Sequence, residues 1–421
     1  MAERPGRTSK QGSANVRNTG RRTRGGRLGR ICAAYCLAAL TAALGWLYSS
    51  LPDHISLEPG QALALPRFAY IQPMGGSGAR NVASTWTAGS YQATLSIGGV
   101  LPVKTVRAVI TPRPSVRVCG TPFGVKMFSE GALVVGFTDL NGPDGAPANP
   151  AKEAGLRLGD RVICIGDTAT ESNDAVKAAL EQAGGQPVRV VYVRDGSQQQ
   201  TFLTPCWDET AQEWRAGMWV RDSSAGVGTL TFIDEENGVF AGLGHSISDG
   251  DTGQSIALRS GEIVPCEIIG CTQGAAGSPG ELKGKFIGSH AVGTIEINGE
   301  NGVYGSTRTS FAGQVMEVAF AQEVVEGPAQ ILTTTRGQTA RLYDVEIEKV
   351  TDAEQVRNMV IHVTDPALLA ETGGIVQGMS GSPILQDGRL AGAVTHVLVN
   401  DPTRGYAIFA ETMLAQAGAV E

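Results

Sequence analysis

The sequence predicts a mainly β protein, with an all-β barrel or sandwich pair in its C-terminal half, a smaller mixed domain before it and an apolar helix near the N-terminus. Glycine is abundant, at 56 of 421 residues, and aromatic residues make up only 6%. This composition favours short strands and tight turns. Residues 206–421 carry many turn signals and little helical periodicity, as is typical of an all-β barrel or of a pair of β-sandwiches. The length allows two or three domains.

The N-terminus combines a basic tail with an apolar segment. Residues 1–30 hold nine Lys or Arg side chains and one acidic side chain, and their polar composition predicts disorder. Residues 31–51 carry no charge and match the length of a membrane-spanning helix. Because a basic flank marks the cytoplasmic side, we expect a signal anchor whose tail is cytoplasmic.

A cleaved secretory signal is the alternative interpretation of the apolar segment. The bulky residues Trp46, Leu47 and Tyr48 leave no good small-residue cleavage site at its end, which favours an uncleaved anchor. Both interpretations export everything after residue 51. The sequence therefore predicts a membrane-anchored or secreted protein whose main part lies outside the cytoplasm.

Charge and cysteine content argue against two classes of function. The formal net charge is -7 despite the basic tail, so the body is acidic and a poor partner for nucleic acid. Five cysteines follow the apolar segment, an odd number whose spacings match no zinc pattern; they are Cys119, Cys164, Cys206, Cys266 and Cys271. We expect no metal and no cofactor. Cys266 and Cys271 either pair or remain free.

Residues 52–118 predict a spacer followed by a β-rich segment. Pro, Gly and Ser clusters extend to about residue 90. The alternating polar and apolar residues of 92–97 then predict a half-buried strand.

Residues 119–204 predict a small domain with one clear helix. The stretch AGLRLGDRVICIGD, residues 154–167, indicates a helix end, a turn at Gly159-Asp160 and a strand. Ser172 or Asn173 caps a predicted helix over 174–183, which ends at two glycines. This pattern resembles a bacterial PDZ domain.

The PDZ resemblance implies a groove in which an extended peptide adds to a sheet edge beside the helix. It places backbone amides near Gly124 and Val125 against a terminal carboxylate. Val176 and Leu180 would line the apolar wall, although both could equally be plain core residues.

A serine flanked by glycines is the strongest chemical signal. The stretch Gly378-Met379-Ser380-Gly381-Ser382-Pro383 precedes a hairpin whose turn is Asp387-Gly388. Glycines let a backbone turn sharply beside a substrate, and a nucleophilic serine needs nearby N–H groups for the oxyanion. The G-x-S-x-G elbow does not fit, because position 382 is serine and a strand follows. A plain Gly/Ser turn is the alternative.

A nucleophilic serine needs a base, which is usually histidine. The chain has five, namely His54, His245, His290, His362 and His396. His54 lies close to the apolar segment and is a poor candidate. His245 follows a predicted hairpin in the first half of the barrel region, before the serine, as in a two-barrel peptidase. His396, after a predicted strand, is its main competitor.

Longer stretches resemble one family, the SpoIVB peptidases of spore-forming bacteria. They are GVLPVKTVRAV, RAGMWVRDSSAGVGTLTF, GLGHSISD and VTDPALLAETGGIVQGMSGSPILQDGRLAGAVTHVLVNDPTRGYA. The order of anchor, PDZ domain and peptidase also matches. The resemblance implies a chymotrypsin-like serine peptidase with a double β-barrel over residues 206–421.

The resemblance also assigns roles to residues. Ser380 would be the nucleophile, His245 the base and Asp365 the acid that orients it. The N–H groups of Gly378 and Ser380 would hold the oxyanion. Asp365 lies only 15 residues before Ser380, whereas the acid of chymotrypsin-like enzymes usually lies in mid-chain, so Asp249 remains a rival.

The biological role comes from the resemblance alone. It implies export into the forespore intermembrane space, self-cleavage, and cleavage of a membrane-bound inhibitor of an intramembrane metalloprotease, which triggers sigma-factor processing in sporulation. An HtrA-like quality-control protease is one alternative, although its PDZ domain follows the protease. A non-catalytic PDZ scaffold is the other.

Overall fold

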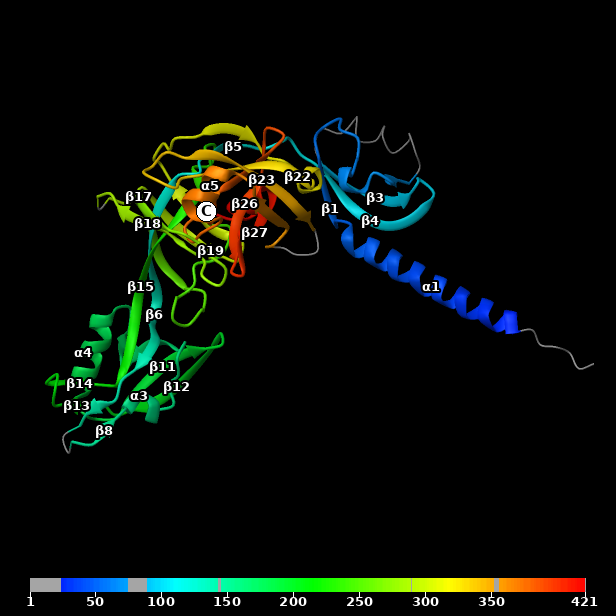
Figure 1. Ribbon diagram of the computed structural model, residues 1–421. Helices are drawn as coiled ribbons and strands as arrows, with labels where there is room; N and C mark the ends of the chain where they lie inside the picture. The colour runs from blue at the N-terminus through cyan, green and yellow to red at the C-terminus, as the bar shows by residue number, and fades with distance from the viewer. Residues whose placement is uncertain (1–23, 75–88, 143–144, 289, 352–355, 421) are drawn as a thin grey trace, which may run out of the picture. The chain divides into compact units, whose positions relative to one another are not determined.

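The computed structural model describes residues 24–74, 89–142, 145–288, 290–351 and 356–420 (Figure 1). Most of the predicted basic tail, residues 1–23, lies outside the described part. Helix α1 (Arg24–Ser50) follows. Its segment Arg30–Ser50 is the one described helix long and apolar enough to cross a membrane, which makes it a candidate for a membrane anchor or a signal sequence.

The segment after α1 forms a four-stranded sheet rather than a spacer. Its strands are β1 (His54–Leu57), β2 (Ile71–Pro73), β3 (Gly89–Ile97) and β4 (Leu101–Ile110), in the order β1-β4-β3-β2. The 3-10 helix η1 (Pro66–Phe68) lies between β1 and β2. The prediction of a spacer up to residue 90 is therefore wrong for β1 and β2. These strands are too short to show periodicity, but Ile55 and Leu57 are buried in them.

Six strands form a closed ring, the first barrel. They are β6 (Pro122–Phe137), β17 (Leu258–Thr272), β19 (Gly293–Gly299), β20 (Gly302–Thr307), β16 (Val239–Gly242) and β15 (Met218–Asp234), and the pairing of β15 with β6 closes the ring. β18 (Glu281–Phe286), β5 (Ser115–Val118) and β21 (Gln314–Glu317) extend it.

Six other strands close the second barrel, in the order β22-β23-β24-β27-β26-β25. They are β22 (Gly327–Thr333), β23 (Arg341–Val350), β24 (Met359–Val363), β25 (Pro383–Gln386), β26 (Arg389–Leu398) and β27 (Asp401–Phe409). The 3-10 helix η2 (Ala321–Glu323) precedes this barrel, and α5 (Pro366–Thr372) and α6 (Ala410–Ala417) complete it. Asp387 and Gly388 both have positive φ, as the predicted two-residue turn requires. The predicted double barrel is confirmed.

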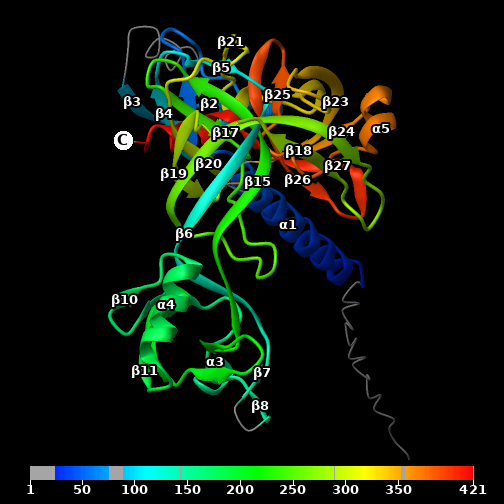
Figure 2. The same ribbon diagram turned by 90° about the vertical axis from the view of Figure 1, so that its left-hand side faces the viewer.

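The small domain is inserted into the first barrel. β6 begins in the barrel and runs into the small domain, and β15 runs from the small domain back into the barrel. The two strands pair along most of their lengths (Figure 2). The chain between them forms β9 (Arg161–Ile165), β11 (Val188–Arg194), β12 (Ser197–Leu203), α3 (Pro150–Glu153) and α4 (Asn173–Ala183). Short pairs complete it: β7 (Leu140–Asn141), β8 (Pro147–Ala148), β10 (Thr168–Ala169), β13 (Cys206–Asp208) and β14 (Glu213–Arg215).

This insertion corrects the predicted boundaries, which gave residues 119–204 to the small domain and 206–421 to the barrels. The first half of β6 pairs with β17 and belongs to the barrel. Sequence periodicity could not reveal this, because one strand serves both the barrel and the small domain. The predicted helix is confirmed: Ser172 caps α4 through its side chain, and Gly184 ends it in a left-handed conformation.

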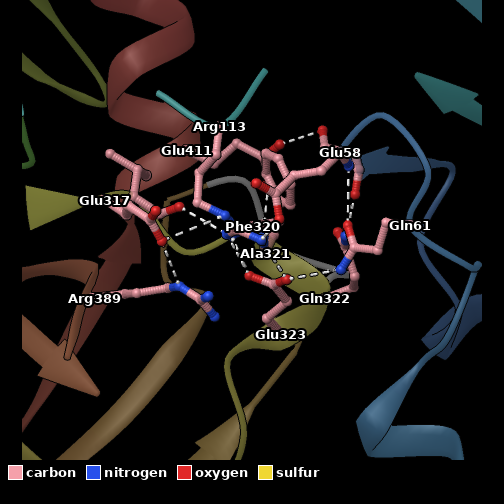
Figure 3. A network of polar contacts seen from close by, with 12 residues as sticks. Glu58, Gln61, Arg113, Glu317, Phe320, Ala321, Gln322, Glu323, Arg389 and Glu411 are labelled. Atoms are coloured by element: carbon pink, nitrogen blue, oxygen red, sulfur yellow. Dashed lines mark hydrogen bonds and ion pairs between the residues drawn. The ribbon is translucent and has the colours of Figure 1, made fainter. Parts of the chain in front are cut away.

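A buried arginine connects the N-terminal sheet to the barrels (Figure 3). Arg113, just after β4, pairs with Glu58 at 2.9 Å and with Glu323 at 2.7 Å, and it lies 4.4 Å above the Phe320 ring. Because the guanidinium is desolvated and paired on both sides, its interactions are stronger than those of surface ion pairs. The sheet is thus fastened to the residues around η2.

Candidate active site

The predicted nucleophile lies on a tight loop that crosses from α5 to β25. Gly378 has a φ of 95°, which favours glycine. Gly381 is confined even more, since an added Cβ would come within 2.0 Å of the Thr229 carbonyl. Ser380 between them is partly exposed. Its Oγ donates a hydrogen bond to the Thr395 carbonyl at 2.6 Å.

The peptide groups of this loop are held in fixed orientations. The carbonyls of residues 377 to 381 accept hydrogen bonds from Leu282, Thr229, Ser382 and Thr231. The N–H of Met379 donates to Val376 and that of Gly381 to Val394. In the described part of the chain, the N–H groups of Gly378 and Ser380 have no acceptor. Two unpaired donors on either side of one residue are what an oxyanion requires.

His245 lies on the loop after β16 in the first barrel. Leu243 and Gly244 before it both have positive φ, of 67° and 68°, and such a conformation is strained for leucine. The Nδ1 atom of His245 lies 2.7 Å from the Ser246 carbonyl. A carbonyl only accepts, so Nδ1 carries the proton and Nε2 is left with a free lone pair. Burial lowers the pKa of His245, opposed by its bond to Ser246.

The barrels bring His245, His396 and Ser380 to one cavity of about 930 Å³. The rings of the two histidines lie against each other, with centroids 4.6 Å apart and planes tilted by 36°. The pKa of His396 is also lowered, by partial desolvation and by the neighbouring His245. Both imidazoles are therefore mainly neutral at pH 7, which is the state a general base needs.

The two acidic candidates have other partners. Asp365 caps α5: its Oδ1 accepts from Ala367 N at 2.8 Å and from Leu368 N at 3.1 Å. Among the described residues, none of its hydrogen bonds reaches His245. The prediction that Asp365 orients the base therefore has no support in the geometry. Asp365, which the family resemblance implied as the acid, is the N-cap of α5, and Pro366 takes the first helical position.

Asp249, the rival acid, is buried in the loop that follows His245. It forms an ion pair with Arg221 of β15 and accepts from Thr252 N at 2.9 Å. Burial by itself would raise the pKa of Asp249, but the bonds from Thr252 and Arg221 outweigh it and lower the pKa. Asp249 thus fastens the His245 loop to β15 and does not touch the imidazole.

The predicted carboxylate loop of the small domain is corrected. Gly124 and Val125 lie within β6, where they pair with β15 on one side and β17 on the other. Their amides therefore belong to the barrel ladder. Glycine is required at 124 by packing, because an added Cβ would meet the Phe286 ring at 2.4 Å.

Val176 and Leu180 belong to the hydrophobic core of the small domain and also line a cavity beside α4. Each is buried on α4 among the apolar residues of the small domain. Both also line a cavity of about 510 Å³, whose lining includes Trp214 and Trp219. The two interpretations of these residues were not exclusive.

Comparison with known families agrees with this geometry. Residues 212–414 match the family described as SpoIVB peptidase S55. Residues 212–414 therefore form a peptidase domain of the SpoIVB peptidase S55 family. An S55 peptidase is a serine peptidase, a hydrolase acting on peptide bonds. Residues 144–194 of this S55 peptidase match the PDZ domain. No curated protein matches the chain significantly.

Sequence reasoning missed several residues of the site. Thr229 and Thr231 of β15 hold the nucleophile loop through their hydroxyls, and the Ser246 carbonyl engages His245. Alternating threonines in GTLTF only signal a strand face, so nothing local marks their partners. The five described cysteines of the body are free, including Cys266 and Cys271.

Proposed function

We propose that this S55 peptidase is an endopeptidase acting outside the cytoplasm, with Ser380 as nucleophile and His245 as base. The observation that carries the proposal is the arrangement around Ser380: it shares one cavity with His245, and the unpaired N–H groups lie on its own backbone and on that of Gly378. Neutral Nε2 of His245 is the atom available to accept the serine proton.

The mechanism follows from these positions. Ser380 Oγ exchanges its bond to Thr395 for one to His245 Nε2 and attacks the scissile carbonyl while His245 takes its proton. The N–H groups of Gly378 and Ser380 stabilise the oxyanion. His245 then protonates the leaving amine, and water releases the acyl group by the same steps in reverse. We assign the orienting role to the Ser246 carbonyl, because it already selects the required tautomer.

An extended peptide is the substrate that this site suits. The pairing of β26 with β25 ends at Ala393, whereas its pairing with β27 continues to Leu398. The stretch Thr395–Val397 therefore has an edge without a strand partner among the described residues, and it lines the cavity beside Ser380. A substrate strand can pair with this edge, so main-chain hydrogen bonds would place its scissile bond.

We further propose that the PDZ domain controls the peptidase. Residues 218–221 of β15 pair with β6, and the cavity bordered by α4 lies along this strand, which is the arrangement of a groove for an added peptide strand. Arg221 at the end of this stretch holds Asp249 in the His245 loop. A peptide bound in the groove could therefore affect His245 through residues 218–221 of β15 and the ion pair of Arg221 with Asp249.

The biological role that we propose rests on the family. A tethered chain cleaves itself and then a membrane-bound inhibitor of an intramembrane metalloprotease, in the forespore intermembrane space, and so triggers sigma-factor processing during sporulation. The apolar helix Arg30–Ser50 suits such a tether. A tethered enzyme meets membrane-bound substrates at high effective concentration.

The test uses the full chain in detergent, a fluorophosphonate probe for reactive serines, and mass spectrometry of self-cleavage fragments. We expect labelling at Ser380 and defined fragments. The Ser380→Ala variant should neither react with the probe nor produce these fragments, and its rate of cleavage should fall on the order of a millionfold. A folded wild-type chain that neither labels nor cleaves would favour the scaffold alternative. Preferential cleavage of unfolded proteins over a folded membrane-bound inhibitor would favour the HtrA-like alternative.

A further inference from the structure

Strand β15 reaches across from the first barrel to the nucleophile loop of the second. The Oγ1 of Thr229 donates to the Gly378 carbonyl at 2.9 Å, and its N–H donates to the Ser380 carbonyl at 3.0 Å. The Oγ1 of Thr231 donates to the Gly381 carbonyl at 2.7 Å. Both threonines are buried, at 2% and 0% exposure. Three carbonyls around the nucleophile are therefore held by two residues of another barrel.

The Thr229 hydroxyl holds the peptide group that separates the two oxyanion donors. This group joins Gly378 to Met379, and its N–H is held at the other end by the Val376 carbonyl at 3.1 Å. Rotation of this peptide would change the angle between the Gly378 and Ser380 N–H groups. Gly378 has a φ of 95° and can readily adopt other conformations. Glycine therefore makes the hole possible but does not hold it in shape.

The same threonine also contacts the strand that leads to the base. The Thr229 carbonyl accepts from Leu243 N at 3.4 Å, two residues before His245. Gly381 fits between these elements only because it lacks a Cβ, which would lie 2.5 Å from Leu243 N. Thr229 thus touches both halves of the site, although it lies outside the cavity lining.

We propose that Thr229 is a positioning residue for the oxyanion hole, with Thr231 supporting it through the next peptide. The proposal rests on Ser380 being the nucleophile. Without its hydroxyl, Thr229 would leave the partly buried Gly378 carbonyl without a donor, and such a group seeks another partner by rotation. The hole then loses its shape for an oxyanion, which exists only in the transition state, while the binding of substrate is unaffected.

The experiment compares Thr229→Val with Thr229→Ser in the full chain in detergent. Valine keeps the shape and removes the hydroxyl, whereas serine keeps the hydroxyl. With a fluorogenic peptide we expect Thr229→Val to lower kcat by about tenfold to a hundredfold, since loss of one oxyanion donor costs about 10²–10³, and to leave KM within about twofold. Fluorophosphonate labelling should slow in parallel. Thr229→Ser should recover most of both rates.

Thr170→Val is the matched control. Thr170 is fully buried in the PDZ domain and its hydroxyl donates to the Val162 carbonyl at 2.6 Å, so it measures the general cost of removing such a bond. The Tm of Thr170→Val should fall by about as much as that of Thr229→Val, but its kcat on the short peptide should stay at the wild-type value. If Thr229→Val does not fold, Thr231→Val and Thr229→Ser provide the comparison, with a smaller loss expected for Thr231→Val.

The outcomes separate the two proposals. Inactivity of Ser380→Ala together with wild-type kcat for Thr229→Val would overturn the role of Thr229 and leave the nucleophile standing. A rise in KM with unchanged kcat, or failure of serine to recover the rate, would also overturn it. Full activity of Ser380→Ala would instead remove the proposed function itself.

Discussion

Asp365 gives the sharpest test of the geometry, because the two roles considered for it predict opposite results for one substitution. In the structure its carboxylate accepts from two backbone N–H groups at the start of α5, at 2.8 and 3.1 Å. Asparagine is as good an N-cap as aspartate. Asp365→Asn should therefore leave both stability and kcat close to those of the wild type. A triad acid replaced in this way would cost roughly ten-thousandfold in kcat, through the wrong histidine tautomer.

Asp365→Ala separates stability from chemistry at the same position. Alanine removes both capping bonds, and loss of an N-cap costs about 1 kcal/mol of folding free energy. The side chain is only half-buried, so the loss should not exceed that figure, and we expect a fall in Tm of about 2 °C. The kcat of the folded fraction should be unchanged.

The assay is kcat on a fluorogenic peptide for the full chain, beside thermal unfolding of each variant. Ser380→Ala gives the rate of background cleavage. A folded Asp365→Asn variant that loses three or more orders of magnitude in kcat would refute our assignment. It would mean that the carboxylate leaves the cap and orients His245 during turnover.

Four further predictions concern the base and the groove. His245→Ala should be about as damaging as loss of the nucleophile, since such groups act as a unit, and His396→Ala much less so; the reverse ranking would make His396 the base. Because burial lowers the pKa of His245 from its ordinary 6.5, kcat/KM should stay full down to pH 6.5 and fall only below it; a limb above pH 6.5 would contradict this. Acidification below 6.5 should also destabilise the fold, because the unfolded chain then binds more protons. Replacing Val176 and Leu180 by Asp should alter self-cleavage while short-peptide turnover is kept; equal loss of both, with lower Tm, would show that they act only as core.

Local sequence patterns were enough to predict the structure wherever the interactions that decide it lie within a few residues of one another. The cap at Ser172 and the glycines after α4 delimit that helix by backbone hydrogen bonds of neighbouring residues. The turn at Asp387-Gly388 is set by two adjacent positive φ values. Glycines around Ser380 likewise announce a tight loop. Family resemblance then extended these signals to an enzyme class, which comparison of residues 212–414 confirmed.

The sequence by itself thus determined a mainly β fold, the helix of the PDZ domain and the tight loop of Ser380, whereas the partners of that serine were decided only by tertiary structure. Thr229 lies about 150 residues from Gly378 in the chain, and no periodicity relates a strand hydroxyl to a carbonyl in another barrel. The role of Asp365 depends on tertiary structure for the same reason: the resemblance implied a triad acid, and only the position of its carboxylate relative to His245 separates a catalytic group from a helix cap. The insertion of the PDZ domain was hidden because β6 and β15 are long strands that run from the barrel into the small domain, and strand pairing is a property of distant segments rather than of either strand alone.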